Sequence, residues 1–179
     1  KEVVVQDAPR GMLRPQQADA VKQMEHYAPV SYRKLSRQEI DSASRTSRRR
    51  IHSSAYVFDM GQNLSGFPEI KVRGNRGDTV TLVVSEALTP EGACDQRQSG
   101  RPHFYQYILK GEGIETWHPR FSYYGFRYIQ VEGAEYLNRG NKVAGTTSRN
   151  YTAGRKNNRS ELPELLELKS CFVYNSAPL

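Results

Sequence analysis

The sequence lacks several features that would define its class directly. It has only two cysteines, Cys94 and Cys171, which are too few for a disulfide scaffold and cannot supply a four-cysteine zinc site. The sequence leaves open whether they pair with each other. No apolar run approaches the roughly 18 residues of a membrane-spanning helix, so we expect no membrane segment. The N-terminus, KEVVVQDAPRG, has neither an initiator Met nor a signal-peptide apolar stretch, so we expect a removed leader or a piece of a longer protein.

What is present is enough for one folded domain. The 179 residues carry 26 Lys and Arg against 19 Asp and Glu, giving a formal charge of +7, and the hydrophobic fraction is 37%. Eleven Tyr, six Phe and one Trp supply large apolar side chains, which excludes a wholly disordered chain. We therefore expect one domain, or one domain with arms.

Short β-type segments separated by turn residues dominate the chain from residue 55 onward. They lie at residues 55–60, 67–73, 79–88, 104–110, 115–118, 121–132 and 165–174. Residues 67–73 alternate with period two, residues 74–78 (GNRGD) have turn composition, and residues 79–88 are rich in β-branched side chains, so a β-hairpin is predicted here. The βαβ alternation of a parallel fold is absent. We predict an all-β fold, an antiparallel β-sandwich with a C-terminal return strand.

The first 50 residues have a weaker pattern. Residues 16–28 fit either three helical turns or an extended arm, and residues 41–50 (DSASRTSRRR) have the composition of a solvated loop. We expect residues 1–50 to be an irregular N-terminal arm and linker from a preceding domain. Residues 51–179 then form the β-sandwich domain, with a mobile, Gly-, Asn- and Arg-rich loop at about 137–160.

No residue set predicts a cofactor or metal site. The four histidines are scattered, and no His-x-x-x-His or Cys-x-x-Cys spacing occurs; they are His26, His52, His103 and His118. Glycoside hydrolysis would need two carboxylates facing each other, and the candidates Asp59, Glu86 and Glu132 are more simply explained as structural hydrogen-bond partners. Metal ligands, cofactors and catalytic residues are therefore not expected within this chain.

The basic residues form two clusters, which raises the question of nucleic-acid binding. One cluster is Arg45, Arg48, Arg49 and Arg50, and the other is Arg149, Arg155, Lys156 and Arg159. Both lie in segments of loop composition, away from the aromatic strands that would stack on bases. Solvated loop charge is the simpler interpretation, so we expect neither nucleic acid nor a membrane as a partner.

The aromatic residues around Trp117 and residues 121–128 offer another possibility. Aromatic faces stack on the apolar faces of sugars, while Arg and Asn side chains bind hydroxyl groups. The candidate carbohydrate-binding residues are Trp117, Tyr124, Arg127 and Asn63. Alternating aromatics in a sandwich strand also fill the core, so both interpretations stay open.

Three stretches, taken together, resemble the bacterial α-L-rhamnosidases of glycoside hydrolase family 78. They are residues 59–66 (DMGQNLSG), residues 85–88 (SEAL) with Gly92, and residues 117–128 (WHPRFSYYGFRY), with residues 107–111 (YILKG) fitting between them. Each motif alone is weak, but their order and spacing match. The motif residues to which we assign structural roles are Asp59, Gly61, Gln62, Asn63, Gly66, Glu86, Gly125, Phe126, Arg127 and Tyr128.

This resemblance implies a concanavalin-like, jelly-roll β-sandwich that precedes an (α/α) toroid carrying the catalytic acid and base. The toroid's Asp-Gly-Cys-Pro-x-x-x-Arg-like context is absent here, so no catalytic residue is carried over. The implied function is a non-catalytic accessory module that packs on its own toroid, with rhamnose-containing glycans as possible ligands of the parent enzyme. The compartment stays open, with a periplasmic or secreted parent as one expectation. The alternatives are an independent carbohydrate-binding module and a basic nucleic-acid-binding β domain.

Overall fold

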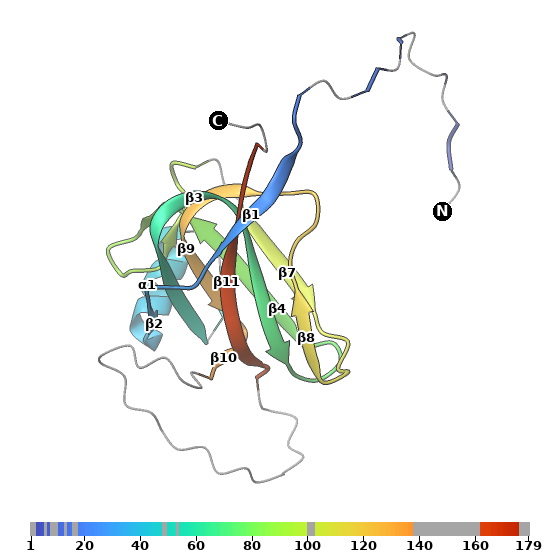
Figure 1. Ribbon diagram of the computed structural model, residues 1–179. Helices are drawn as coiled ribbons and strands as arrows, with labels where there is room; N and C mark the ends of the chain where they lie inside the picture. The colour runs from blue at the N-terminus through green and yellow to red at the C-terminus, as the bar shows by residue number, and fades with distance from the viewer. Residues whose placement is uncertain are drawn as a thin grey trace.

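The computed structural model shows a fold built almost entirely from β-strands (Figure 1). The described residues are 3–5, 7, 11–12, 14–15, 18–47, 50–52, 54–99, 103–137 and 162–175. The elements are β1 (Val21–Tyr27), β2 (Ser31–Lys34), α1 (Arg37–Ser47), β3 (Ala55–Arg73), β4 (Thr79–Ser85), β5 (Ala87–Leu88), β6 (Cys94–Asp95), β7 (Phe104–Ile108), β8 (Ile114–Trp117), β9 (Tyr124–Glu132), β10 (Glu135–Tyr136) and β11 (Glu164–Asn175). The predicted all-β class is confirmed, with one short helix added.

Nine strands of the described residues form one sheet, in which neighbouring strands follow the order β1-β11-β3-β9-β4-β7. β2 and β8 also pair with β3, and β10 pairs with β11. The pairs in this sheet are antiparallel, except that β10 and β11 run parallel. The predicted return strand is confirmed as β11, which lies between β1 and β3.

The sheet curls because β3 is long and bent (Figure 1). Its N-terminal half pairs with β2 and β9, and its C-terminal half pairs with β11 and β8. The register with β9 shifts between Asp59 and Leu64, so that residues 60–63 lie opposite Arg127 alone. Such a bulge bends the strand and increases its twist. The strands predicted at 55–60 and 67–73 are therefore two halves of one bulged strand, which contributes to both layers of the predicted sandwich.

The core lies inside this curl and receives side chains from both halves of β3. Tyr56 and Phe58 come from one half, and Ile70 and Val72 come from the other. β9 lies between β3 and β4 and is therefore a central strand, and it begins at Tyr124 rather than at residue 121 as predicted. The largest fully buried members of this core are Phe58, Ile70, Leu82, Leu109, Phe126, Ile129 and Leu165.

Strict alternation of side chains does not hold along β9. Period two places Phe126 and Tyr128 on the same face, but Phe126 is buried in the core while Tyr128 packs, half-buried, on a second cluster. Ile129 and Val131 then continue the core face. The physical reason is the bulge in β3 opposite Arg127, because a bulge changes which residues face inward on either side of it.

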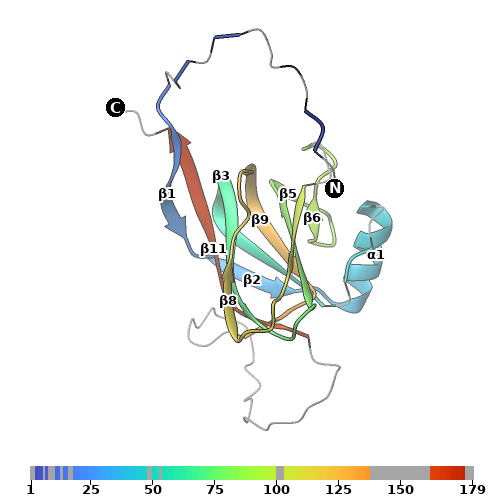
Figure 2. The same cartoon turned by 90° about the vertical axis from the view of Figure 1, so that its right-hand side faces the viewer.

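The second cluster forms where α1 packs on the outer face of the sheet. Ile40 and Ala43 of α1 contact Leu35, Ala55 and Val57, and Figure 2 shows α1 on the side of the sheet away from β1. The solvated loop predicted at residues 41–50 was therefore wrong for residues 41–47, which are helical. Ile40 and Ala43 are three residues apart and so lie on the same face of the helix. Their packing outweighs the polar composition of this segment.

A capping box marks the start of α1. The Glu39 backbone N–H donates to Ser36 Oγ at 3.3 Å, and the Ser36 N–H donates back to Glu39 Oε2 at 2.7 Å. This reciprocal pair satisfies two donors that a helix N-terminus leaves unpaired. The Ser-Arg-Gln-Glu spacing was visible in the sequence and would have predicted the helix.

The hairpin predicted between residues 67–73 and 79–88 was also wrong. β3 and β4 are not neighbours, because β9 lies between them in the strand order. The turn at residues 74–78 carries the chain from one part of the curled sheet to another. The second predicted strand also ends early, at Ser85, and Ala87–Leu88 is the separate strand β5, which pairs with β6. Composition identified the strands but not their partners.

The N-terminal segment contributes more than an arm. β1 pairs with β11 over Val21–Tyr27, so the extended alternative for residues 16–28 is confirmed for this part. β2 pairs with β3, and the cluster around α1 includes Ile51 together with residues on the other side of residue 50. The domain division at residue 50 stays a prediction about the parent protein, but the packing crosses it. The predicted mobile loop falls outside the described residues, apart from Leu137.

The two cysteines do not pair. Cys94 lies on β6 and Cys171 on β11, and both are buried as free thiols. Burial raises the pKa of the Cys171 thiol to about 12, so this group stays protonated at neutral pH.

Phe126→Ala should remove a large part of the stability of the fold. Phe126 is completely buried, and truncating a buried Phe costs about 3–5 kcal/mol, against a total of about 5–15 kcal/mol for a domain. Chemical denaturation of the isolated chain measures this loss. Phe121→Ala is the matched control, because Phe121 is fully exposed and its truncation should leave the midpoint nearly unchanged. Equal midpoints for the two variants would contradict the burial of Phe126.

Candidate functional site

Five of the motif residues come together around the bulge of β3. We call Asp59, Asn63, Glu86, Gly125 and Arg127 the motif cluster. Arg127 donates from Nε to Asp59 Oδ1 and from Nη2 to Asp59 Oδ2, both at 2.9 Å. This bidentate arrangement is the strongest geometry for an ion pair between Arg and a carboxylate. It joins β9 to β3 at the point where their register shifts.

The Asp59 carboxylate also holds the turn of the bulge. Gly61 N–H donates to Asp59 Oδ1 at 2.7 Å, and Gly61 adopts a φ of 84°, in the region that favours glycine. The hydrogen bonds from Arg127, together with that from Gly61, hold the pKa of Asp59 below its ordinary value of 3.8, although partial burial acts in the opposite direction. Asp59 is therefore a carboxylate at neutral pH and occupied by partners within the fold.

Glu86 and Asn63 form the second link of the motif cluster. Asn63 Nδ2 donates to Glu86 Oε1 at 2.8 Å, which ties the bulge to the chain after β4. Gly125 lies against the same carboxylate, since a Cβ built there would stand 3.1 Å from Glu86 Oε1. Glycine at residue 125 therefore leaves room for this contact.

Gly66 serves a different contact. A Cβ at this position would lie 2.0 Å from the carbonyl oxygen of Cys171, an atom of the β11 backbone that cannot move aside. Gly66 is paired with Phe172 of β11 and with Tyr124 of β9. Only glycine lets the three strands approach this closely. The motif residue Gln62 lies exposed in the bulge.

The two predicted sugar-stacking rings lie apart from each other and are partly covered. Trp117 ends β8 and stacks on Tyr107, with ring centroids 5.1 Å apart. Tyr124 begins β9 and stacks on His103 at 4.3 Å. Both rings are half-buried and pack against the core. The structure thus brings Asn63 and Arg127 into the motif cluster and places Trp117 on another strand. Carbohydrate binding by these three residues and Tyr124 stays a prediction.

The chain between Trp117 and Tyr124 presents exposed aromatic side chains. We call residues 118–123 the aromatic loop. Phe121 is fully exposed and has a φ of 64°, which makes it the one non-glycine residue with positive φ in the described chain. Tyr123 is also exposed, whereas His118 stacks on Phe67 and anchors the base of the loop. A bulky side chain in this conformation is strained and gains nothing from burial.

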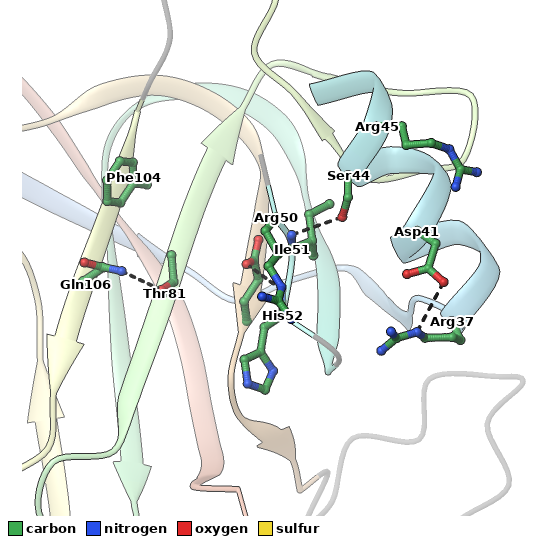
Figure 3. Close-up of a pocket in the computed structure, with 11 residues that line it drawn as sticks. Arg37, Asp41, Ser44, Arg45, Arg50, Ile51, His52, Thr81, Phe104 and Gln106 are labelled. Atoms are coloured by element: carbon green, nitrogen blue, oxygen red, sulfur yellow. Dashed lines mark hydrogen bonds and ion pairs between the residues drawn. The ribbon is translucent and has the colours of Figure 1, made fainter. Parts of the chain in front are cut away.

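A pocket of about 810 Å³ lies between α1 and the strands β4 and β7. Figure 3 shows Arg37, Asp41, Ser44 and Arg45 on the helix side, with Phe104, Gln106 and Thr81 on the strand side. Arg50, Ile51, His52 and Glu132 complete the wall. We call this concavity the helix pocket. Sequence reasoning missed it because its residues come from five separate segments, one of which belongs to the unpredicted helix.

The basic clusters are divided by the structure. Arg45 and Arg50 line the helix pocket, whereas Arg48, Arg49 and the whole cluster at residues 149–159 fall outside the described residues. Within the described residues, no three His, Cys, Asp or Glu side chains come together as metal ligands. No helix in the described part of the chain has the length and apolarity needed to cross a membrane.

The curled antiparallel sheet with its bulged central strand defines a concanavalin-like β domain. The profile of the bacterial alpha-L-rhamnosidase concanavalin-like domain matches residues 49–148. An alpha-L-rhamnosidase of Formosa agariphila is 32% identical over 127 residues, which cover 68% of this chain and 12% of that protein. The chain therefore belongs to the bacterial α-L-rhamnosidase family, and the resemblance of its three motifs is confirmed.

Other relatives agree with this assignment. An alpha-L-rhamnosidase of Streptomyces avermitilis is 41% identical over 81 residues, covering 44% of this chain and 8% of that protein. The solved alpha-L-rhamnosidase of Dictyoglumus thermophilum superposes with a TM-score of 0.59 at 22% identity, covering 93% of this chain and 14% of that one. At this identity the likeness shows the fold. The chain thus spans only a small part of the proteins it matches.

Asp59→Asn should weaken the fold and change its response to acid. Because the folded-state pKa of Asp59 lies below the unfolded value, its contribution is present above the ordinary value of 3.8 and is lost as the pH falls through the lower folded pKa. We expect a loss of about 1–2 kcal/mol at pH 7, since Arg127 is partly exposed and water screens the pair. Below about pH 4 the difference from the parent should shrink.

Denaturant unfolding at a series of pH values measures this effect. Asp41→Asn is the control, because the Asp41–Arg37 pair at 3.3 Å lies on the exposed surface of α1 and should contribute less than about 0.5 kcal/mol. A loss at Asp59 that is no larger than the loss at Asp41, or that does not vary with pH, would contradict a structural role for the ion pair.

Proposed function

We propose that this chain is a non-catalytic module of an α-L-rhamnosidase and that it docks on the enzyme's catalytic (α/α) toroid. The family assignment supports a place in such an enzyme, and the chain covers only 12% of the Formosa agariphila relative. The Streptomyces avermitilis relative has been solved in complex with L-rhamnose, which supports a rhamnose-containing glycan as the substrate of the whole protein. The module's contribution is to hold the catalytic domain in its folded, active arrangement.

The fully exposed Phe121 is the observation that carries this proposal. Holding a Phe at positive φ costs about 1–3 kcal/mol, and exposing its ring to water adds to the cost. The aromatic loop that presents it runs directly into Tyr124 and Gly125, where the motif cluster fixes the start of β9. An anchored loop with a protruding ring is the form of a hot spot at a protein interface. We infer that the ring is buried against the catalytic domain.

The motif cluster itself fits a scaffold rather than a catalytic pair. Glycosidases need two carboxyl groups about 5–9.5 Å apart across a cleft, one of them free to donate a proton. Here Asp59 is held by Arg127 and Gly61, and Glu86 accepts from Asn63. Each carboxylate stabilises the bulge of β3.

The isolated chain should therefore not hydrolyse aryl α-L-rhamnosides. An assay with 4-nitrophenyl α-L-rhamnoside at high protein concentration measures this directly. Asp59→Asn and Glu86→Gln serve as controls for contaminating enzyme, because contaminant turnover is the same in all preparations. Turnover that co-purifies with the chain and disappears in either variant would contradict the accessory role.

Phe121→Asp should have no effect on the stability of the isolated chain and should weaken the parent enzyme. In the isolated chain the midpoint of unfolding should stay unchanged, because the ring makes no buried contact there. In the parent enzyme the change should lower the melting temperature and the rhamnosidase activity, because a charge replaces a buried aromatic anchor and costs about 2 kcal/mol or more. Thermal unfolding and activity assays of both proteins test this.

Two further variants sharpen the comparison. Phe121→Leu keeps an apolar side chain and should retain most of the parent enzyme's stability. Ile108→Asp introduces the same charge at an exposed residue of β7 and should affect neither protein. If Phe121→Asp and Ile108→Asp behave alike in the parent enzyme, the aromatic loop is not the docking surface.

A further inference from the structure

The helix pocket has the size and composition of a small-molecule site. The proposed docking of the aromatic loop on the catalytic domain does not involve this pocket. Its volume of about 810 Å³ falls in the range of about 300–1,000 Å³ that ligand pockets occupy. α1 forms one wall, and β4 and β7 form the other (Figure 3). Glu132 lies at the far end of β9 from Tyr124, where the aromatic loop joins this strand. The pocket and the proposed docking loop are therefore separate surfaces.

Among the described charged groups of the pocket, the guanidinium of Arg50 is available to a ligand. Asp41 is paired with Arg37 at 3.3 Å. The buried Glu132 accepts hydrogen bonds from the His52 backbone N–H at 3.2 Å and from Gln130 Nε2 at 2.7 Å. Arg50, by contrast, forms no ion pair or hydrogen bond with another residue of the described chain. Figure 3 shows the guanidinium of Arg45 on the side of α1 away from Arg50.

A guanidinium group of this kind suits an anionic ligand group. A guanidinium presents several N–H donors in a planar fork, which matches the paired oxygens of a carboxylate or a sulfate. The two carboxylates of the lining have partners of their own, Asp41 with Arg37 and Glu132 with the His52 backbone and Gln130. Arg50 is therefore the group of the pocket that suits an anionic ligand group.

The strand side provides a different kind of surface. Phe104 is 42% exposed and lines the pocket, so part of this side chain is open to a ligand. Gln106 Nε2 donates to Thr81 Oγ1 at 3.3 Å, and this amide–hydroxyl pair has remaining donors and acceptors. An aromatic face beside neutral polar groups matches a sugar ring, which has apolar C–H faces and hydroxyl edges. A flat apolar ligand would leave the polar groups unsatisfied.

We propose that the helix pocket binds an acidic sugar residue, that is, a pyranose that carries a carboxylate or a sulfate ester. The anionic group contacts Arg50, and the ring lies against Phe104 with its hydroxyls toward Thr81 and Gln106. Because the pocket is open and polar, the affinity for a monosaccharide is low, about millimolar. The site would recognise an acidic unit of a glycan independently of any catalytic site.

Nuclear magnetic resonance titration of the isotope-labelled 179-residue chain at low salt tests this. D-glucuronate provides the carboxylate, and glucose 6-sulfate provides the sulfate ester. D-glucose is the matched control without a charge. We expect saturable shifts at Thr81, Gln106 and Arg50 with at least one acidic sugar, and at least about fivefold weaker binding of glucose. Inorganic sulfate tests for a bare anion site and should bind more weakly than the acidic sugar.

Three variants assign the binding to the pocket. Arg50→Gln and Phe104→Ala should each weaken binding about fivefold or more, because they remove the anion contact and the ring contact, respectively. Lys22→Gln removes one positive charge from the exposed strand β1 and should leave binding unchanged. Arg50 and Phe104 are exposed, so dispersed spectra should confirm that both variants are folded.

Three results would overturn the proposal. They are the absence of saturable shifts, equal binding of D-glucose or inorganic sulfate, and acidic-sugar binding that Arg50→Gln leaves intact. None of these results bears on the docking of the aromatic loop, which is measured with Phe121 variants in the parent enzyme. The two proposals can therefore fail separately.

Discussion

The bend in β3 is the constraint on which the rest of the structure depends. A strand of 19 residues cannot stay straight and line both sides of one core, so the bulge at residues 60–63 is needed to close the curl. The ion pair of Asp59 with Arg127 holds that bulge across the strand boundary, and the hydrogen bond from Asn63 to Glu86 fixes its far end. Without these contacts the tight turn and the register shift would have to be maintained by core packing alone.

The same contacts explain why the family motifs occur where they do. Residues 59–66 contain the bulge, and Asn63 within it donates a hydrogen bond to Glu86. Residues 125–128 lie on the strand opposite the bulge. Motifs that are far apart in the sequence therefore meet at one place in the fold. The contacts at this place also set the direction in which the chain passes from the aromatic loop into β9. The polar motif residues are thus occupied inside the fold, while the apolar residue Phe121 faces outward. The same short segments therefore set both the geometry of the bulge and the position of the exposed ring.

The sequence predicted the strands well because alternation and β-branching are local signals, and β9, β11 and both halves of β3 were found this way. Partners are not local, so residues 67–73 and 79–88 were wrongly paired as neighbours when β9 separates them. The helix was missed because its polar composition masked Ile40 and Ala43, although the capping box of Ser36 with Glu39 was present. Tyr128 was placed on the wrong face because no sequence pattern shows a bulge on the opposite strand. The helix pocket requires all of these arrangements at once and could not be predicted.

The position of β11 in the sheet has a consequence for how the chain assembles. Of the described elements β11 is the last, yet it lies between β1, the first described strand, and β3. It pairs with β3 residues about 100 positions earlier and with β1 residues about 150 positions earlier. Contacts across such long sequence separations slow folding, because a large loop must close before they form. During synthesis, β1 has no partner until residues 164–175 have left the ribosome. The first strand of this module therefore joins the sheet last, and its exposed edge is available to other chains in the interval.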